Sequence, residues 1–382
     1  MYFTALAGLA SLAFSQCASA TPTLERRANQ YRQNAHTAVK KMQQPMYYRT
    51  PSPAAWTIGW WNCAQAVTLL ADLREGDNSQ FLRQITDGEQ GVFNVTWRDQ
   101  AVDSNRAFTY TSYFDDRLWW TVAMIKVFDV TKNNQYLVSA RRTFVRVAAD
   151  IDKDPCGLFN NAYPGTPRGS SVITQTLYIE AAALLAKRTP AQKANYLKMA
   201  RAAWKELKAD MYIDGLIQGD GLQKRNGQDT CSSNYAFLTY QEGAAMAAMV
   251  AMADATGNAD WLDIAQSIAE KTASGQYGMI VNGIAKEYCD ADFSCNGDSG
   301  MFKGIMMRGF YEVYKARPSV GGGGIPQLLK NNADSIWNNA RNTKNNMLGL
   351  NWSGPFKASS QIDYRLTYHI SATMALVYAS LV

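Results

Sequence analysis

The sequence predicts an all-α protein, an (α/α)6 barrel in which six helix pairs close into a ring. Apolar helical segments recur about every 55 to 65 residues, more polar helical segments alternate with them, and strand-like alternation is scarce. Helices that contact neighbours on every side must be apolar all round, so the apolar segments are expected to form the inner ring. They begin near Ile58, Tyr113, Val172, Phe237, Met301 and Ile362.

The more polar segments are expected to form the outer ring. They span residues 28–42, 78–85, 133–151, 190–210, 259–272 and 325–341. Residues 191–210 carry basic side chains on one stripe and apolar ones on the other, which is typical of an outer helix. Residues 242–255 are nearly all small or apolar, as an inner helix requires. Thr189-Pro190 is a typical helix start.

Two short stretches, residues 91–97 and 277–284, are candidates for β structure. Neither repeats at the spacing of a sandwich or a barrel. The chain length would also allow two helical domains divided near Asp210. The helical period continues across that point, which favours a single ring.

The N-terminus predicts secretion. Residues 2–14 are an apolar run too short for a permanent anchor, and Ala18-Ser19-Ala20 offers the small residues that signal peptidase prefers, although no basic residue precedes the run. We expect a signal peptide over residues 1–20 and a pro-segment over residues 21–27 that ends at Arg26-Arg27. Residues 28–382 then form a single domain. No later segment predicts a membrane anchor, and residues 370–382 lack the polar spacer of a lipid-anchor signal.

The composition excludes several classes of chemistry. His36 and His369 are the two histidines, so a Ser-His-Asp triad or a histidine-rich metal site has little to draw on. We expect His36 to be exposed on a polar helix and His369 to be packed in the core. No dinucleotide fingerprint or phosphate loop is present, and the mild net charge of +6 shows no nucleic-acid motif. We therefore expect no cofactor and no nucleic-acid partner.

The cysteines are compatible with an oxidising compartment. Removal of Cys17 with the leader leaves five, and their odd number predicts that at least one is not bonded within the chain. Cys289 and Cys295 enclose a short loop and are the best candidates for a disulfide, whereas Cys63 lies in an apolar helix and is expected to be a buried thiol. The pairing of Cys156 and Cys231 stays open. Asn94 and Asn351 begin glycosylation sequons.

The adjacent carboxylates Asp115 and Asp116 permit two interpretations. An Asp-Asp pair at a helix start commonly caps the helix and supplies acidic residues to its first turn. Two neighbouring carboxylates beside Tyr113, Trp119 and Trp120 also suit cleavage of a glycosidic bond, which needs a proton donor, a nucleophile and flat rings for the sugar. Asp290, Asp292 and Asp298 lack the spacing of an EF-hand, so we expect no metal site.

Taken together, these segments resemble glycoside hydrolase family 76, the endo-α-1,6-mannanases, whose fold is an (α/α)6 barrel. The resemblance rests on blocks in the family's order over nearly the whole mature chain. These are Trp60-Trp61-Asn62, Asp115-Asp116-Arg117-Leu118-Trp119-Trp120, Thr239-Tyr240-Gln241-Glu242-Gly243, the Cys289 to Cys295 loop with Asn296-Gly297-Asp298, and Phe302-Lys303-Gly304-Ile305. The chain departs from the family's pattern at Gln175-Thr176, Gln241-Glu242 and the segment 154–159.

The resemblance implies a secreted, retaining, endo-acting hydrolase of α-1,6-linked mannose chains. It assigns Asp115 as the nucleophile and Asp116 as the general acid/base, an order that the sequence alone leaves open. The expected partner is a cell-wall polysaccharide, and the protein is expected to be a monomer without a membrane anchor. A transglycosidase that uses the same pair and a non-catalytic carbohydrate-binding toroid are alternatives. The candidate substrate-binding residues are Trp60, Trp61, Tyr113, Trp120, Asp220, Tyr240, Gln241 and Lys303.

Overall fold

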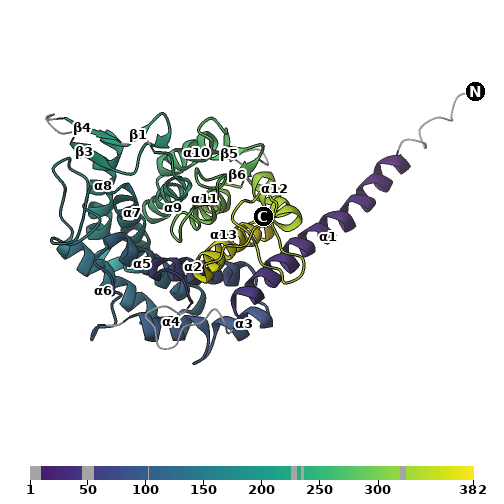
Figure 1. The fold of residues 1–382 in the computed structure, drawn as a ribbon, viewed down its shortest axis with the longest axis horizontal. Helices are drawn as coiled ribbons and strands as arrows, with labels where there is room; N and C mark the ends of the chain where they lie inside the picture. The colour runs from purple at the N-terminus through teal and green to yellow at the C-terminus, as the bar shows by residue number, and fades with distance from the viewer. Residues whose placement is uncertain (1–9, 45–55, 102, 225–229, 234–235, 319–323) are drawn as a thin grey trace, which may run out of the picture.

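The computed structural model describes residues 10–44, 56–101, 103–224, 230–233, 236–318 and 324–382. Six helices surround a central axis (Figure 1). Each packs on the next along the chain, and the last one returns to the first and closes the ring. These inner helices are α2 (Trp60–Gly76), α5 (Phe114–Thr131), α7 (Val172–Arg188), α9 (Thr239–Thr256), α11 (Phe302–Ala316) and α13 (Ile362–Ser380). The predicted (α/α)6 barrel is confirmed, with helices on both sides of Asp210 in one ring.

The outer helices pack on the outside of this ring. Helix α6 packs on α5, α8 on α7 and α10 on α9, while α1 and α12 both pack on α13. Two short helices, α3 and α4, together fill the outer position after α2. The outer elements are α1 (Ala10–Met42), α3 (Gln80–Thr86), α4 (Val92–Gln100), α6 (Asn134–Asp150), the 3-10 helix η2 (Pro190–Gln192), α8 (Lys193–Asp210), α10 (Asp260–Ala273) and α12 (Gly324–Asn339).

Two sequence predictions differ from the structure. The helix expected over residues 28–42 begins at Ala10, so the described part of the predicted leader continues α1, which extends away from the ring in Figure 1. The strand expected over residues 91–97 is wrong, because this stretch belongs to α4. Its buried residues Val92, Phe93, Thr96 and Gln100 are spaced as one face of a helix, and a short apolar run does not distinguish helix from strand.

Three small antiparallel hairpins lie between the helices. Strands β1 (Tyr212–Ile213) and β2 (Leu216–Ile217) pair after α8, and β3 (Leu222–Lys224) pairs with β4 (Cys231–Ser233). Strands β5 (Ile280–Val281) and β6 (Ile284–Ala285) form the third hairpin, within and just beyond the predicted β stretch 277–284. None of the described helices combines the length and the apolar character that crossing a membrane requires.

Glycines set the close packing between α9 and α11. A Cβ atom added at Gly243 would lie 2.4 Å from the carbonyl oxygen of Ile305, and one added at Gly309 would lie 2.5 Å from that of Gly243. The two backbones therefore approach too closely for any side chain at these positions. This contact holds the N-terminal halves of α9 and α11 beside each other, and their first turns belong to the end of the ring where the candidate site lies.

Candidate active site

The candidate site lies where the N-terminal ends of the inner helices meet. Asp115 and Asp116 stand in the first turn of α5, Tyr240 and Gln241 in the first turn of α9, and Trp61 in the first turn of α2. Tyr240 stacks on Phe302, the first residue of α11, with ring centroids 3.9 Å apart. Residues from distant parts of the chain thus share one end of the barrel.

The aspartate pair does not cap α5. Tyr113 occupies the N-cap position, and no side chain there accepts a capping hydrogen bond. Asp115 and Asp116 follow within the first turn, and both are half-buried. The Oδ1 atom of Asp115 is buried and has no hydrogen-bond partner within the described residues. A buried carboxylate oxygen without a partner is costly, so it indicates a group reserved for a ligand.

The surroundings of the pair favour protonation of both carboxyls. Burial and the charges of Asp220 and Asp298 raise the pKa of Asp115, and backbone N–H groups of the helix start lower it, which together leaves the pKa at about 7. Burial and the charge of Asp115 raise the pKa of Asp116 well above its usual range, against a hydrogen bond from Thr111. Because the two interact strongly, they titrate as a pair.

Arg117 holds the loop that leads into the pair. Its Nε donates to the carbonyl of Thr111 at 2.8 Å and its Nη2 to that of Thr109 at 3.2 Å, while its Nη1 donates to the Tyr163 hydroxyl at 2.6 Å. The backbone N–H of Phe114 donates to the carbonyl of Asn161 at 2.7 Å. These bonds fix the segment that leads into α5. Tyr113, at the N-cap of α5, remains 37% exposed.

Asp220 reaches the site from the loop between β2 and β3. Its Oδ1 accepts hydrogen bonds from Gln241 Nε2 at 2.6 Å and from the Tyr240 hydroxyl at 3.3 Å. Burial raises the pKa of Asp220, and its charge in turn raises the pKa values of Asp115 and Tyr240. Asp220, Tyr240 and Gln241, chosen from the sequence, thus form one hydrogen-bonded group near the pair.

A model of glycosyl hydrolase family 76 matches residues 19–381. The chain belongs to glycosyl hydrolase family 76. The predicted family is therefore confirmed. No functionally curated protein matches the chain.

Solved structures of this fold include other family 76 proteins. The GH76A α-1,6-mannanase of Salegentibacter sp. HEL1_6 is 19% identical, with a TM-score of 0.76 over 92% of this chain and 99% of that one. An inactive variant of that enzyme, with two consecutive aspartates replaced by alanine, was solved with α-1,6-mannotetrose and is 18% identical, with a TM-score of 0.73 over 92% and 99% of the two chains. Dfg5 from Chaetomium thermophilum, solved with glucosamine, is 17% identical, with a TM-score of 0.75 over 94% and 90%. At these identities the similarity establishes the fold.

The structure corrects the prediction for Trp120. Its side chain is fully buried and stacks on Phe108 at a centroid distance of 4.7 Å, so it cannot contact a sugar. Trp60 is only 6% exposed and donates its indole N–H to Gln100 at 2.9 Å. The inner helices need large apolar side chains at their contacts, and these two tryptophans meet that need. Trp61 is the more accessible of the neighbouring pair.

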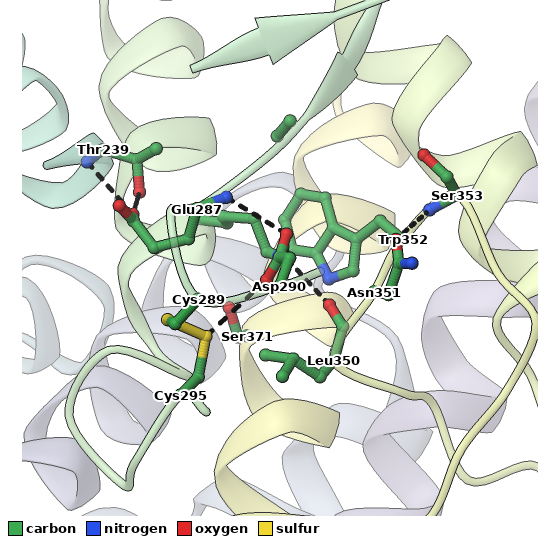
Figure 2. A network of polar contacts seen from close by, with 12 residues as sticks. Thr239, Glu287, Cys289, Asp290, Cys295, Leu350, Asn351, Trp352, Ser353 and Ser371 are labelled. Atoms are coloured by element: carbon green, nitrogen blue, oxygen red, sulfur yellow. Dashed lines mark hydrogen bonds and ion pairs between the residues drawn. A yellow bond between two sulfur atoms is a disulfide. The ribbon is translucent and has the colours of Figure 1, made fainter. Parts of the chain in front are cut away.

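The prediction for Lys303 is also wrong. Lys303 is fully buried, and its Nζ lies 2.5 Å from Asp290 and donates to the carbonyl of Leu350 at 2.7 Å. Asp290, Leu350 and Trp352 are labelled in Figure 2, and the Trp352 ring centroid lies 5.0 Å from the Lys303 Nζ. The charge of Lys303 is paired inside the protein and its side chain has no exposed surface, so it cannot contact a substrate. Gln241 is likewise fully buried and acts through Asp220.

Family departures at Gln175 and Glu242 turn out to be structural. Gln175 Oε1 accepts the backbone N–H of Phe159 at 2.9 Å, and its Nε2 donates to the carbonyl of Ala203 at 2.9 Å. Glu242 is fully buried and accepts the backbone N–H of Ile217 at 3.2 Å, while burial raises its pKa to about 8. Gln175 thus bonds to the segment before α7 and to α8, and Glu242 bonds to β2.

The cysteines form two disulfides. Cys289 pairs with Cys295, as predicted (Figure 2). Cys156 pairs with Cys231 and thereby joins the segment before α7 to β4. Cys63 is a buried thiol.

Of the two sequons, Asn94 lies in α4, and the half-buried Asn351 donates from Nδ2 to the carbonyl of Gly354 at 3.2 Å.

The histidines take no part in the site. His369 is buried, accepts the backbone N–H of Leu348 at Nδ1, and lies 2.9 Å from the carbonyl of Ala38 through Nε2, so the proton is on Nε2. Burial lowers its pKa to about 4, and the predicted core role is confirmed. His36 is half-buried rather than exposed and lies 2.7 Å from Asp77. Within the described residues, no group of three or more His, Cys, Asp or Glu side chains could hold a metal ion.

Sequence reasoning missed Asp298 as a residue of the cleft. Its carboxylate accepts the indole N–H of Trp61 at 2.7 Å, and its charge raises the pKa values of both Asp115 and Asp116. The signal available was its place in the Asn-Gly-Asp segment after the Cys289–Cys295 loop. That segment gave no indication that it would reach α2.

Proposed function

We propose that this family 76 protein is a retaining, endo-acting hydrolase of α-1,6-linked mannose chains, with Asp115 as the nucleophile and Asp116 as the general acid/base. The observation that carries the proposal is the pair of adjacent, half-buried carboxyls in the first turn of α5, one of which has a buried oxygen without a hydrogen-bond partner among the described residues. A glycosidase needs one carboxylate and one carboxylic acid at the same bond. The substrate is taken from the related α-1,6-mannanase structures.

In the first step, the Asp115 carboxylate attacks the anomeric carbon while Asp116 donates its proton to the glycosidic oxygen. The bond to the leaving sugar breaks, and a mannosyl ester on Asp115 forms. In the second step, Asp116 takes a proton from a water whose oxygen attacks the same carbon, and the ester bond breaks. Two inversions leave the product in the α configuration.

The test is to incubate the protein with linear α-1,6-mannan and follow the products by mass. Short oligomers support hydrolysis, and proton NMR of early products should show the α-anomer first. A β-anomer first would contradict the two-step route and the nucleophilic role of Asp115. Redistributed chain lengths would instead favour the transglycosidase, and an unchanged polymer would favour a binding toroid or another substrate.

We also propose that the protein works outside the reducing cytosol. The two disulfides, Cys156–Cys231 and Cys289–Cys295, support this, because such bonds persist mainly in oxidising compartments. Mass analysis of the protein from culture medium tests secretion, the cleavage at Arg27, and glycans at Asn94 and Asn351. Intact protein retained inside cells would contradict the proposal.

A further inference from the structure

Trp61 is built as a flat platform with one face supported by the protein. Its ring stacks on Trp119, with centroids 5.9 Å apart and planes inclined by 24°. Trp119 is only 3% exposed and forms a fixed backing, whereas Trp61 is half-buried. Trp61 therefore has one supported face and keeps part of its surface accessible, as stacking of a sugar ring requires.

The Asp298 carboxylate fixes the edge of this platform. The indole N–H of Trp61 donates to Asp298 Oδ1 at 2.7 Å. The neighbouring Asn62 donates from Nδ2 to the carbonyl of Gly297 at 3.3 Å, so the segment 297–298 contacts two successive residues of α2. A charge-assisted bond of this kind is about twice as strong as a neutral one.

The segment that carries Asp298 is itself held in place. Asn296 Oδ1 accepts the backbone N–H groups of Asp298 and Ser299, each at 2.9 Å. The preceding Cys295 is bonded to Cys289, and its carbonyl accepts the Tyr368 hydroxyl at 2.5 Å. The position of Asp298 is therefore set from α13 and from the disulfide loop.

Asp298 also belongs to the electrostatic surroundings of the aspartate pair. Its charge raises the pKa values of Asp115 and Asp116. The other groups that act on the pair are the Asp220 carboxylate, the Arg117 guanidinium and the Thr111 hydroxyl. Asp298 thus both holds an accessible aromatic ring and acts on both candidate catalytic carboxyls.

We propose that Asp298 is a positioning residue that fixes the Trp61 ring as the saccharide platform beside the Asp115–Asp116 pair. The inference rests on the proposed function for its substrate class. The negative charge of Asp298 also acts on the pH profile. It shifts the pH range of activity to higher values than the pair alone would have.

Two variants separate the effects of geometry and charge. Asp298→Ala removes both the acceptor and the charge, whereas Asp298→Asn keeps an oxygen acceptor for Trp61 and removes the charge. Asp292→Asn is the matched control, because Asp292 is an exposed acid in the adjacent disulfide loop. Trp61→Phe removes the N–H that Asp298 accepts.

Binding is measured by calorimetry with α-1,6-mannotriose, in a background that carries Asp115→Asn and Asp116→Asn so that no turnover occurs. We expect Asp298→Ala and Trp61→Phe each to weaken binding about tenfold, the usual effect of losing a hydrogen bond to a charged group. Combining them should weaken binding little further, since both break one contact. Effects that multiply, or full-strength binding by Asp298→Ala, would overturn the inference.

Activity gives an independent measurement in the otherwise unchanged protein. Asp298→Asn should shift both limbs of the pH profile of kcat/KM to lower pH, because a charge that raises both pKa values is gone. Trp61→Phe and Asp292→Asn should leave the limbs in place. Limbs unmoved in Asp298→Asn would contradict the role of the charge.

The two proposals fail in different ways. If the wild type cleaves α-1,6-mannan but Asp298→Ala binds the triose normally, this inference is wrong and the proposed function stands. If the triose binds in an Asp298-dependent manner but the wild type cleaves nothing, the proposed function is wrong and this inference stands. If the triose neither binds nor is cleaved, both are overturned.

Discussion

Buried carboxylates occur in two regions of this barrel, and the two regions treat them differently. In the core, Asp72 Oδ1 lies 3.0 Å from Lys126 Nζ, Glu312 pairs with the same lysine, and Glu180 pairs with Arg308. At the N-terminal ends of the inner helices, Asp115 and Asp116 have acidic neighbours instead. Burial raises the pKa of Glu312 too, but Lys126 and Arg308 lower it overall to about 2, whereas that of Asp115 rises to about 7.

The difference teaches that the available partners, and not burial, distinguish a structural carboxylate from a reactive one. The paired region lies towards the other end of the ring, beside a cavity of about 640 Å³ whose lining includes Lys126, Glu180 and Glu312. There each carboxylate lies beside a basic side chain that lowers its pKa, although burial still leaves the pKa values of Asp72 and Glu180 raised. Carboxyls whose pKa values are shifted by burial and by one another are typical of catalytic sites.

Replacing the unpaired acids should have the largest effect. Asp115→Asn and Asp116→Asn should each lower turnover of the true substrate by at least about 10²- to 10⁴-fold, the usual contribution of acid–base catalysis. Helicity should stay nearly unchanged and the melting temperature should not fall, because neither side chain fills the core. The measurements are product release and circular dichroism. Substantial residual activity would contradict the site assignment, and unfolding would restore the structural interpretation of the pair.

Replacing a paired charge should act on stability instead. Arg308→Met leaves Glu180 buried without its partner, so the free energy of unfolding should fall by about 3–5 kcal/mol. The double variant with Glu180→Leu should recover part of the loss. Asp254→Asn, at the exposed pair with Lys187, is the control and should change stability by less than about 1 kcal/mol. Urea unfolding measures the stability of all three variants. If Arg308→Met is as stable as the Asp254→Asn control, the contrast between the two regions is wrong.

Opening the Cys289–Cys295 disulfide should lower both the stability of the protein and its affinity for substrate. The bond closes a separation of 6 residues, for which the chain-entropy model gives about 2 kcal/mol, against about 4 kcal/mol for the 75 residues of Cys156–Cys231. Cys289→Ala with Cys295→Ala should also weaken substrate binding, because the adjacent segment carries Asp298. Peptide mapping without reduction should recover both linked pairs. An alkylated Cys289 or Cys295 in the native protein would disprove the first bond.

The smallest effect is a pH dependence of stability. Because the pKa of Asp115 is about 7 in the folded protein and 3.8 for an unperturbed aspartate, the folded state binds the proton more tightly. This contribution is present below about pH 3.8 and is lost as the pH rises to about 7. Relative to the wild type, Asp115→Asn should therefore melt higher at pH 8 than at pH 4, by on the order of a few degrees. Calorimetric scans at both pH values measure the difference, and an equal offset at both would contradict a raised pKa.

The extent of sequence prediction follows the range of the interactions involved. Helix α9 could be placed from its composition, because small apolar residues at every position suit only a surrounded helix. The α4 segment was misassigned because its burial pattern depends on what packs against it. Trp60 and Trp120 were chosen as sugar contacts for their residue type, but residues from other segments, such as Gln100 and Phe108, surround them.

By itself, the sequence determined the ring of helix pairs, the family and the placement of Asp115 and Asp116 at a helix start, because periodicity and short motifs are local properties of the chain. Only the tertiary structure decided that Lys303 is neutralised by Asp290, that Asp220 meets Tyr240 and Gln241, and that Asp298 reaches Trp61 across 237 positions. Exposure, charge compensation and the pKa of a carboxyl depend on neighbours brought together by folding, and spacing along the chain does not specify those neighbours.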